Sequence, residues 1–361
     1  MSLWYYAAAS LVLVPAQERQ PPEFRADANM IRLDVSVVDK SGKPIPGLQP
    51  EDFRITEDGR PVDLTYFQAY VPGVDDRADD GADSPRVPPR SIVLLADTAS
   101  MSHGQLLRAR ESAARYLNAP GREGDWVRLM NLATRENWDG RLPEDRERLV
   151  AAARAMSRRP SPWAQVANDV EGIETRVESD FPGEPSEAET TSQFLSVFAQ
   201  ASDLLGTLES LLVQLEAVEG RKALVLLSTG FPQLRGLDRR LESVSTLARQ
   251  SSTAVYFVDA AGLDGLLPER GQKMRPVFEM AWNRSGGASD LAEATGGFTS
   301  RFAGTLHPAL ARVAAEMRTY YVLGYVPPRA QDGRFRTVKV EVTRSGLKAR
   351  TKKGYLAIAG S

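Results

Sequence analysis

The stretch Ile92-Val93-Leu94-Leu95-Ala96-Asp97 decides the fold, because five apolar residues in a row end at a single aspartate. A continuous apolar run of this length is typical of a strand that is buried on both faces in a parallel sheet. Residues 223–227 (ALVLL) and 254–258 (AVYFV) repeat the pattern, and Asp259 follows the second of them. Residues 126–133 add a further strand. Around these runs, one-sided apolar patterns predict helices at residues 105–117, 143–156, 192–218, 237–249 and 306–317.

Sequence on both sides of this region has β character. Residues 31–37 alternate apolar and polar side chains, and Asp58-Gly59 separates two short strand-like runs, which predicts a hairpin. In the tail, residues 319–325 and 335–342 have strand patterns, and residues 347–358 hold the last strand positions.

These patterns predict an α/β protein with two modules. Strands separated by helices predict a doubly wound, mostly parallel sheet over residues 91–318. A module the size of residues 17–70 buries too little apolar surface to be stable alone. Residues 71–90 are rich in Asp, Gly, Pro and Arg and read as a linker. We therefore expect the strands of residues 319–358 to pack on the 17–70 module, so that both chain ends build one small β-sandwich.

The composition excludes several classes of protein. The 361 residues include 45 Lys plus Arg against 47 Asp plus Glu, so the formal charge is -2 and a nucleic-acid binder with a basic face is not expected. The absence of cysteine excludes disulfides, thiolate metal sites, a cysteine nucleophile and a lipid anchor on cysteine. With His103 and His307 as the only histidines, a His-rich metal centre is also excluded.

The first residues indicate export. Residues 3–14 are apolar, but a membrane-spanning helix needs about 20 such residues. The length of the run and the small Ala16 after it fit a secretory signal peptide at residues 1–16, although no Lys or Arg precedes the run. A buried N-terminal strand or helix is the alternative. We expect a secreted or periplasmic protein, and no later stretch approaches a membrane span.

The candidate binding face lies where the strands end. In open α/β sheets, ligands bind beyond the carboxyl ends of the strands. The polar residues that follow these strands are Asp97, Thr98, Ser100, Ser102, Ser228, Thr229 and Asp259. No glycine-rich phosphate loop and no nucleophile elbow occurs, so the sequence predicts no enzyme. A serine hydrolase that uses Asp97, Ser100 and His103 is one alternative, and a purely structural envelope protein is another.

Several motifs in the same order resemble a known family. The apolar strand that ends in Asp97-Thr98-Ala99-Ser100, the Arg-rich helix after it and the segment 220–232 (GRKALVLLSTGFP) resemble the von Willebrand factor A-type (VWFA) domain. More narrowly, the chain is similar to secreted VWFA-related proteins that are abundant in Acidobacteria. The motifs that carry this similarity are LDVSVVD (33–39), DFRITEDG (52–59), LAEATGG (291–297), YYVLGY (320–325) and KGY (353–355).

The resemblance implies a metal-ion-dependent adhesion site, of which this chain keeps little. Such sites use D-x-S-x-S after the first strand, a threonine from a second loop and an aspartate after a later strand, and they bind Mg²⁺ through oxygen ligands. Here Asp97 is present, but the two serine places hold Ala99 and Met101, and the later aspartate place holds Thr229. The candidates for the second-loop threonine are Thr190, Thr191 and Thr207.

The sequence therefore predicts an exported protein-protein interaction module of the adhesion type. It would bind a protein partner through the strand-end loops, with a degenerate metal site and no cofactor. Mg²⁺ is the one cofactor that stays open, with Asp259 as a second carboxylate. Neither nucleic acid nor a membrane span is expected.

Overall fold

The computed structural model describes residues 30–71, 89–158, 187–234, 236–262, 283–330 and 332–357. Its centre is a six-stranded sheet with the order β10-β9-β8-β5-β6-β7. All neighbouring strands are parallel except β7, which is antiparallel to β6. The strands are β5 (Arg90–Ala96), β6 (Asp125–Asn131), β7 (Asn137–Arg141), β8 (Arg221–Ser228), β9 (Thr253–Asp259) and β10 (Thr299–Ser300).

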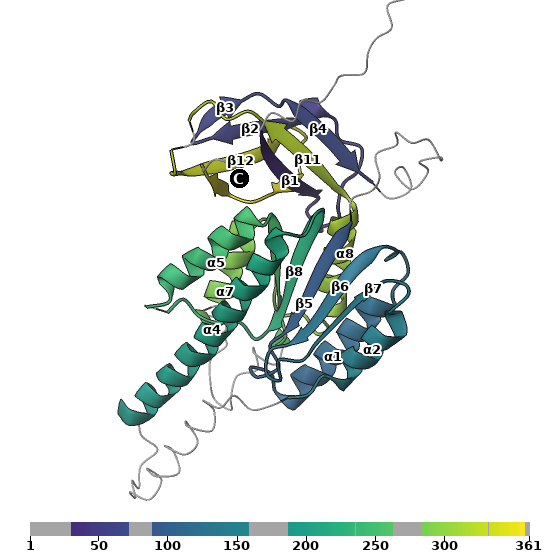
Figure 1. The fold of residues 1–361 in the computed structure, drawn as a ribbon, viewed down its shortest axis with the longest axis vertical. Coiled ribbons are helices and arrows are strands. Elements are labelled where there is room, and N and C mark those ends of the chain that lie inside the picture. The colour runs from purple at the N-terminus through teal and green to yellow at the C-terminus, as the bar shows by residue number, and fades with distance from the viewer. Residues whose placement is uncertain are drawn as a thin grey trace, which may run out of the picture.

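Helices cover both faces of this sheet, so the predicted doubly wound α/β fold is confirmed (Figure 1). One face packs against α1 (His103–Asn118), α2 (Arg146–Ala155) and α8 (His307–Arg318). The other face packs against α4 (Glu187–Glu216), α5 (Asp238–Gln250) and α7 (Gly286–Ala294).

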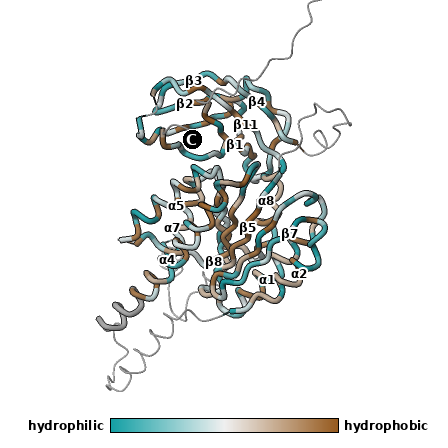
Figure 2. Tube along the Cα trace, in the orientation of Figure 1, coloured by the Kyte–Doolittle hydropathy of each residue, from teal (hydrophilic) through white to brown (hydrophobic). Residues whose placement is uncertain are grey.

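The continuous apolar run of β5 is explained by these two cores. Ile92 and Leu94 point into the core on the α1 side, whereas Val93 and Leu95 point into the core on the α4 side. A strand that lies between two helical layers needs an apolar side chain at every position. Figure 2 shows the resulting concentration of hydrophobic residues along the central strands.

The second module is a sandwich of two four-stranded sheets. One sheet has the order β13-β1-β11-β4 and the other the order β14-β12-β2-β3, and each contains strands from both ends of the chain. The predicted sandwich built from both ends is thus confirmed. Its strands are β1 (Ile31–Val38), β2 (Phe53–Glu57), β3 (Arg60–Val62), β4 (Tyr66–Tyr70), β11 (Tyr320–Tyr325), β12 (Phe335–Val342), β13 (Lys348–Arg350) and β14 (Gly354–Leu356), with a 3-10 turn at Pro50–Asp52.

Tyrosine hydroxyls connect the two ends of the chain inside the sandwich. The Tyr321 hydroxyl donates to the carbonyl oxygen of Ile45 at 2.7 Å. The hydroxyls of Tyr325 and Tyr355 donate to Glu57 Oε2 at 2.8 and 2.9 Å. Because Glu57 is only 2% exposed, its carboxylate depends on these donors.

The sandwich covers the amino end of the central sheet (Figure 1). Arg221, the first residue of β8, donates from Nη2 to Ser36 Oγ at 2.7 Å, and its Nη1 lies 3.9 Å from Asp34 Oδ2. Its guanidinium also lies over the ring of Tyr320, 4.1 Å from the centroid. These contacts hold β1 and β11 against the start of β8, so the carboxyl ends of the strands face away from the sandwich.

Element boundaries differ from the predictions where local chemistry overrides the apolar pattern. Helix α2 begins at Arg146 instead of residue 143, and the residues before it form a turn in which the Arg146 amide donates to the Pro143 carbonyl oxygen. Strand β6 ends at Asn131, two residues earlier than expected. Strand β7 was not predicted, because an edge strand with sequence NWDGR has no apolar alternation.

Two predictions lie on residues that are not described. The signal peptide at residues 1–16 lies outside the described part of the chain, as do residues 72–88 of the proposed linker. Among the helices that are described, none combines the length and apolar character needed to cross a bilayer.

Candidate functional site

The candidate site lies where the strand order of the central sheet reverses. From β5 the chain continues to β6 on one side, and it later returns to β8 on the other side. At such a point the loops after the two strands diverge and leave a crevice beyond their carboxyl ends. The two loops here are residues 97–102 after β5 and residues 229–233 after β8.

Asp97 follows β5 directly and forms hydrogen bonds to β8, so it links the two strands. Its carboxylate Oδ2 accepts a hydrogen bond from Ser228 Oγ at 2.7 Å, and its amide donates to the carbonyl oxygen of Leu227 at 2.8 Å. The residue is 7% exposed. Burial raises the pKa of Asp97, and hydrogen bonds from Ser228 and Ser100 oppose this shift in part. Asp97 is therefore a brace between β5 and β8, with little surface for a partner.

Ser100 and Thr229 tie the two loops together at the surface. The Ser100 hydroxyl donates to the carbonyl oxygen of Asp97 at 2.9 Å and accepts a hydrogen bond from the Thr229 amide at 3.2 Å. Below them, the Ser228 hydroxyl accepts from the Gly230 amide at 2.9 Å. Ser100 and Thr229 are half-buried, so each presents part of its side chain to solvent.

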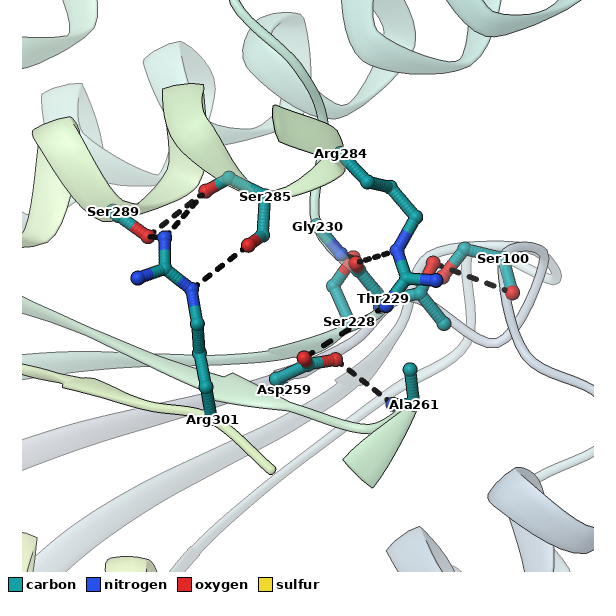
Figure 3. A network of polar contacts seen from close by, with 10 residues as sticks. All are labelled: Ser100, Ser228, Thr229, Gly230, Asp259, Ala261, Arg284, Ser285, Ser289 and Arg301. Carbon is teal, nitrogen blue, oxygen red and sulfur yellow. Dashed lines mark hydrogen bonds and ion pairs between the residues drawn. The ribbon is translucent and has the colours of Figure 1, made fainter. Parts of the chain in front are cut away.

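Asp259 connects the loop after β9 to this pair (Figure 3). Its Oδ1 accepts from the Ala261 amide at 2.9 Å, and its Oδ2 lies 3.9 Å from Arg284 Nη2. Arg284 in turn donates from Nε to the carbonyl oxygen of Thr229 at 3.2 Å. Burial raises the pKa of Asp259, which is 1% exposed, while the charges of Arg284 and Arg301 lower it.

The start of α7 completes the packed unit. Arg301 donates from Nε to Ser285 Oγ at 2.9 Å and also contacts the hydroxyl of Ser289 (Figure 3). Gly230 has a φ of 89°, and a Cβ added there would lie 2.7 Å from the Cβ of Ser285. Only glycine fits this left-handed conformation and this close approach.

The seven predicted binding residues do not all share one surface. Thr98 is fully buried, and its Oγ1 lies 2.6 Å from Asn131 Oδ1, so it points toward β6 and has to be removed from the predicted face. Ser228 and Asp259 are also buried, because they brace the loops from inside. Ser102 is exposed as the N-cap of α1, with its hydroxyl accepting from the Gln105 amide at 3.3 Å. The accessible part of the face consists of Ser100, Ser102 and Thr229, with Asp97 beneath them.

Sequence reasoning missed three contributors to this unit: Arg284, Ser285 and Arg301. They lie before α7 and after β10, in stretches without a periodic pattern, so no spacing indicated that they face Thr229 and Asp259. The Ser228-Thr229-Gly230 segment was the available signal for a tight approach after β8, since glycine after a buried strand often marks close backbone packing.

The side chains present do not fit the metal site that the resemblance implies. Met101 fills a place of a ligating serine, but it is 1% exposed and packs in the core against α1. Ala99 offers only a methyl group. The Thr207 hydroxyl accepts from Arg135 and donates to the carbonyl oxygen of Asp203, four residues earlier on α4. Magnesium requires about six oxygen ligands in octahedral geometry, and here Asp97 is the one carboxylate left among those places.

Of the remaining candidate ligands, Thr190 and Thr191 lie in the part of α4 whose side chains are not described. Within the described ranges, no group of three or more His, Asp or Glu side chains is placed to hold a metal ion.

The hydrolase alternative requires a base on Ser100. The Ser100 hydroxyl donates to the Asp97 carbonyl oxygen, accepts from the Thr229 amide and also interacts with the Asp97 carboxyl group, and no hydrogen bond among the described residues joins it to a histidine base. His103, which this alternative also uses, is exposed as the first residue of α1.

Comparison with known proteins gives no name to this site. No family model matches the chain, and no curated protein matches it. Among solved structures, the chain is similar to the crystal structure of the TFIIH p34 N-terminal domain, with a TM-score of 0.27 and 12% sequence identity over 62% of this chain and 95% of that one. A similarity at this level carries no argument about the site, which is therefore judged on its own geometry.

Proposed function

We propose that this chain is an exported protein-protein interaction module of the adhesion type, without a functional metal site at its strand-end face. It is not an enzyme under this proposal. The observation that carries it is the Ser100–Thr229 contact, in which half-exposed hydroxyl residues on two loops are held by buried groups beneath them.

The preorganisation of these loops supports binding. The Asp97–Ser228 hydrogen bond, the Arg284–Thr229 hydrogen bond and the Gly230 turn each restrict one loop. A surface whose loops are ordered before a partner arrives loses less conformational entropy on association. The surface can therefore keep one shape for a protein partner.

The hydrogen bonding of the hydroxyl groups also favours binding over catalysis. A serine nucleophile needs an adjacent base to take its proton. The Ser100 hydroxyl donates to a backbone carbonyl instead, which fixes its position without activating it. The accessible hydroxyl groups of Ser100, Ser102 and Thr229 are uncharged and lie beside the partly exposed Arg284, so we expect a partner that forms hydrogen bonds across a small polar face.

The test is the recovery of a partner by the whole protein. Native envelope proteins would be crosslinked to the wild type and to a Thr229→Arg variant, which places a bulky cation on the face. The control is Thr337→Arg on the exposed surface of β12, at the far module. A candidate partner is then purified, and its affinity is measured with all three proteins.

We expect Thr229→Arg to weaken the purified partner's binding at least tenfold and Thr337→Arg to leave it unchanged. Equal affinity for all three proteins would show that the strand-end face is not the binding surface. Labelling of Ser100 by a fluorophosphonate probe would instead establish the hydrolase alternative.

The export part of the proposal rests on the leader sequence and is tested separately. Residues 1–29 would be fused to a reporter enzyme that is active only outside the cytoplasm. Reporter activity is expected with the natural leader and not after Leu11→Arg and Leu13→Arg substitutions. A reporter that stays inactive with the natural leader contradicts export.

A further inference from the structure

A second surface lies between the two modules, away from the Ser100–Thr229 contact. It is a groove of about 830 Å³, bounded on one side by β13 and the turn after β1, and on the other by α7, β10 and α8. Grooves between modules are frequent places for ligands, because side chains from independent elements converge there.

The groove carries an excess of positive charge. Seven of the described side chains that line it are Lys or Arg, and three are Asp or Glu. One of the three, Asp39, stays charged but is directed at its own turn, because its Oδ1 accepts from the amides of Ser41 and Lys43 at 2.8 and 3.0 Å. Another, Glu293, is paired with Lys353 at 3.0 Å.

The floor of the groove contains two guanidinium groups for one carboxylate. Arg312 Nε lies 3.1 Å from Glu316 Oε1, and Arg350 contacts the same oxygen. Glu316 is fully buried, and both guanidiniums lie over the ring of Phe298, at 4.0 and 5.1 Å from its centroid. The Arg350 side chain is 10% exposed, and its Nε has no hydrogen-bond partner among the described residues. One positive charge in this cluster therefore remains without a matching anion.

Two lysines on the sandwich side extend this charge to the surface. Lys40 and Lys348 are exposed, and neither forms an ion pair with another described residue. They are close to each other, because Lys348 lies opposite Val38 in the antiparallel pair of β13 and β1, and Lys40 follows Val38 by two residues. Free cations along a groove attract an anionic partner and speed its encounter.

Backbone edges also reach the groove. Strand β10 ends the six-stranded sheet and β13 ends its own four-stranded sheet, so each has one unpaired backbone side in the described structure. Such an edge can pair with an extended chain, which supplies the matching N–H and C=O groups.

We propose that this groove binds an extended acidic segment of a partner protein. The segment lies along the β10 and β13 edges, with its carboxylates toward Lys40, Lys348 and the Arg312–Arg350 pair. Asp290 and Glu293 are exposed on the α7 wall. They disfavour a uniformly charged polyanion, whereas a polypeptide can place neutral or basic residues opposite them.

The probe is a fluorescein-labelled peptide of about twelve residues with alternating Glu and Thr, and its Gln/Thr counterpart is the neutral control. Binding to the full chain is followed by fluorescence anisotropy at about 50 mM and about 150 mM salt. The variant is Lys40→Glu with Lys348→Glu, both at exposed positions. Lys43→Glu is the matched control, because Lys43 is exposed in the same turn but does not line the groove.

We expect the Glu/Thr peptide to bind, the neutral peptide not to bind, and the double variant to lose at least tenfold in affinity. We expect Lys43→Glu to lose less than twofold, and the backbone amide of Thr299, which points away from β9, to gain protection from hydrogen exchange. The proposal fails if the double variant binds as wild type, or if Lys43→Glu loses as much as the double variant. It also fails if inorganic polyphosphate binds more tightly than the peptide, because the groove is then a general polyanion site.

This proposal does not depend on the strand-end face. Thr229→Arg should leave binding of the Glu/Thr peptide unchanged, while it weakens binding of the strand-end partner at least tenfold. If Thr229→Arg weakens the peptide as much as the double lysine variant does, the two surfaces are one site and the groove proposal is wrong.

Discussion

The two ends of the central sheet use buried polar side chains for different purposes. At the amino end, Arg221 and the Glu316 cluster hold the sandwich against the sheet, and long cationic side chains span the gap between modules. At the carboxyl end, Asp97 and Ser228 form a hydrogen bond within one module and restrict two loops. Long charged side chains therefore join the two modules at the amino end, whereas short hydroxyl and carboxylate side chains order the surface loops at the carboxyl end.

The ion pairs at the amino end and the Asp97–Ser228 hydrogen bond at the carboxyl end also differ in their free-energy cost. A buried ion pair is expensive when one partner is removed, because the other charge is left without a counterion. A buried carboxylate with hydroxyl donors costs free energy while it is ionised, and a neutral isostere relieves that cost. The predictions below test this contrast.

The largest effect is expected from removal of the tail that builds the amino-end cap. Deletion of residues 319–361 removes β11 to β14, which supply the partners of β1 and β2. The remaining strands of the sandwich cannot form either sheet, and we expect loss of the sandwich, with proteolysis of residues 30–70. Limited proteolysis and circular dichroism of the truncated chain provide the measurement. Cooperative folding of residues 17–70 alone would contradict the shared sandwich.

The next largest effect is expected at the Glu316 cluster. Glu316→Ala leaves the guanidiniums of Arg312 and Arg350 without their common carboxylate, and we expect a loss of about 3–5 kcal/mol in the free energy of unfolding. Urea denaturation measures it. The control is Glu341→Ala, which breaks the exposed Lys339–Glu341 pair and should leave the free energy of unfolding nearly unchanged, because solvent screens this pair. Equal losses in the two variants would show that the cluster does not hold the modules together.

A smaller effect of opposite sign is expected at Asp97. Because burial raises its pKa, the native protein holds this proton to a higher pH than the unfolded chain, whose carboxyl has a pKa of 3.8. Wild-type stability should therefore fall as the pH rises above about 4, until native Asp97 is ionised. Asp97→Asn removes this fall, so we expect the variant to be more stable than wild type at pH 7, with a smaller difference near pH 4.

Urea unfolding between pH 4 and pH 8 measures the Asp97 effect. Asp63→Asn is the control, since Asp63 is exposed. A variant that is less stable than wild type at every pH would mean that the ionised Asp97–Ser228 hydrogen bond stabilises the loops by more than burial costs.

The smallest effect is expected at Lys352, on the amino-end side. Burial lowers its pKa from 10.5 to about 8, and its Nζ donates to the carbonyl oxygen of Arg249 at 3.2 Å. Between pH 8 and pH 10.5 the unfolded chain binds more protons, so wild-type stability from this group should rise with pH in that window. Lys352→Met should lack this rise, and we expect the difference to be small because the Lys352 side chain is only partly buried. Lys353→Met, which is exposed, is the control for the pH titration. A rise of the same size in Lys352→Met and in wild type would assign it to another group.

The sequence by itself determined the fold class and the position of the candidate face. Apolar runs such as 92–96 identify buried parallel strands, because a strand between two helical layers needs apolar side chains on both faces. Ser100 and Thr229 followed from the rule that, in open α/β sheets, ligands bind beyond the carboxyl ends of the strands. The strand β7 escaped prediction because an edge strand has no such requirement.

Only the tertiary structure decided which polar side chains are exposed and which are buried and hold the loops by hydrogen bonds. Thr98 and Ser100 are two residues apart, yet one is buried against Asn131 and the other meets Thr229 at the surface. Arg284 reaches the face from a segment 55 residues away from Thr229 in the chain. The orientation of a loop side chain depends on groups brought close by the fold, and local periodicity carries no information about those distant neighbours.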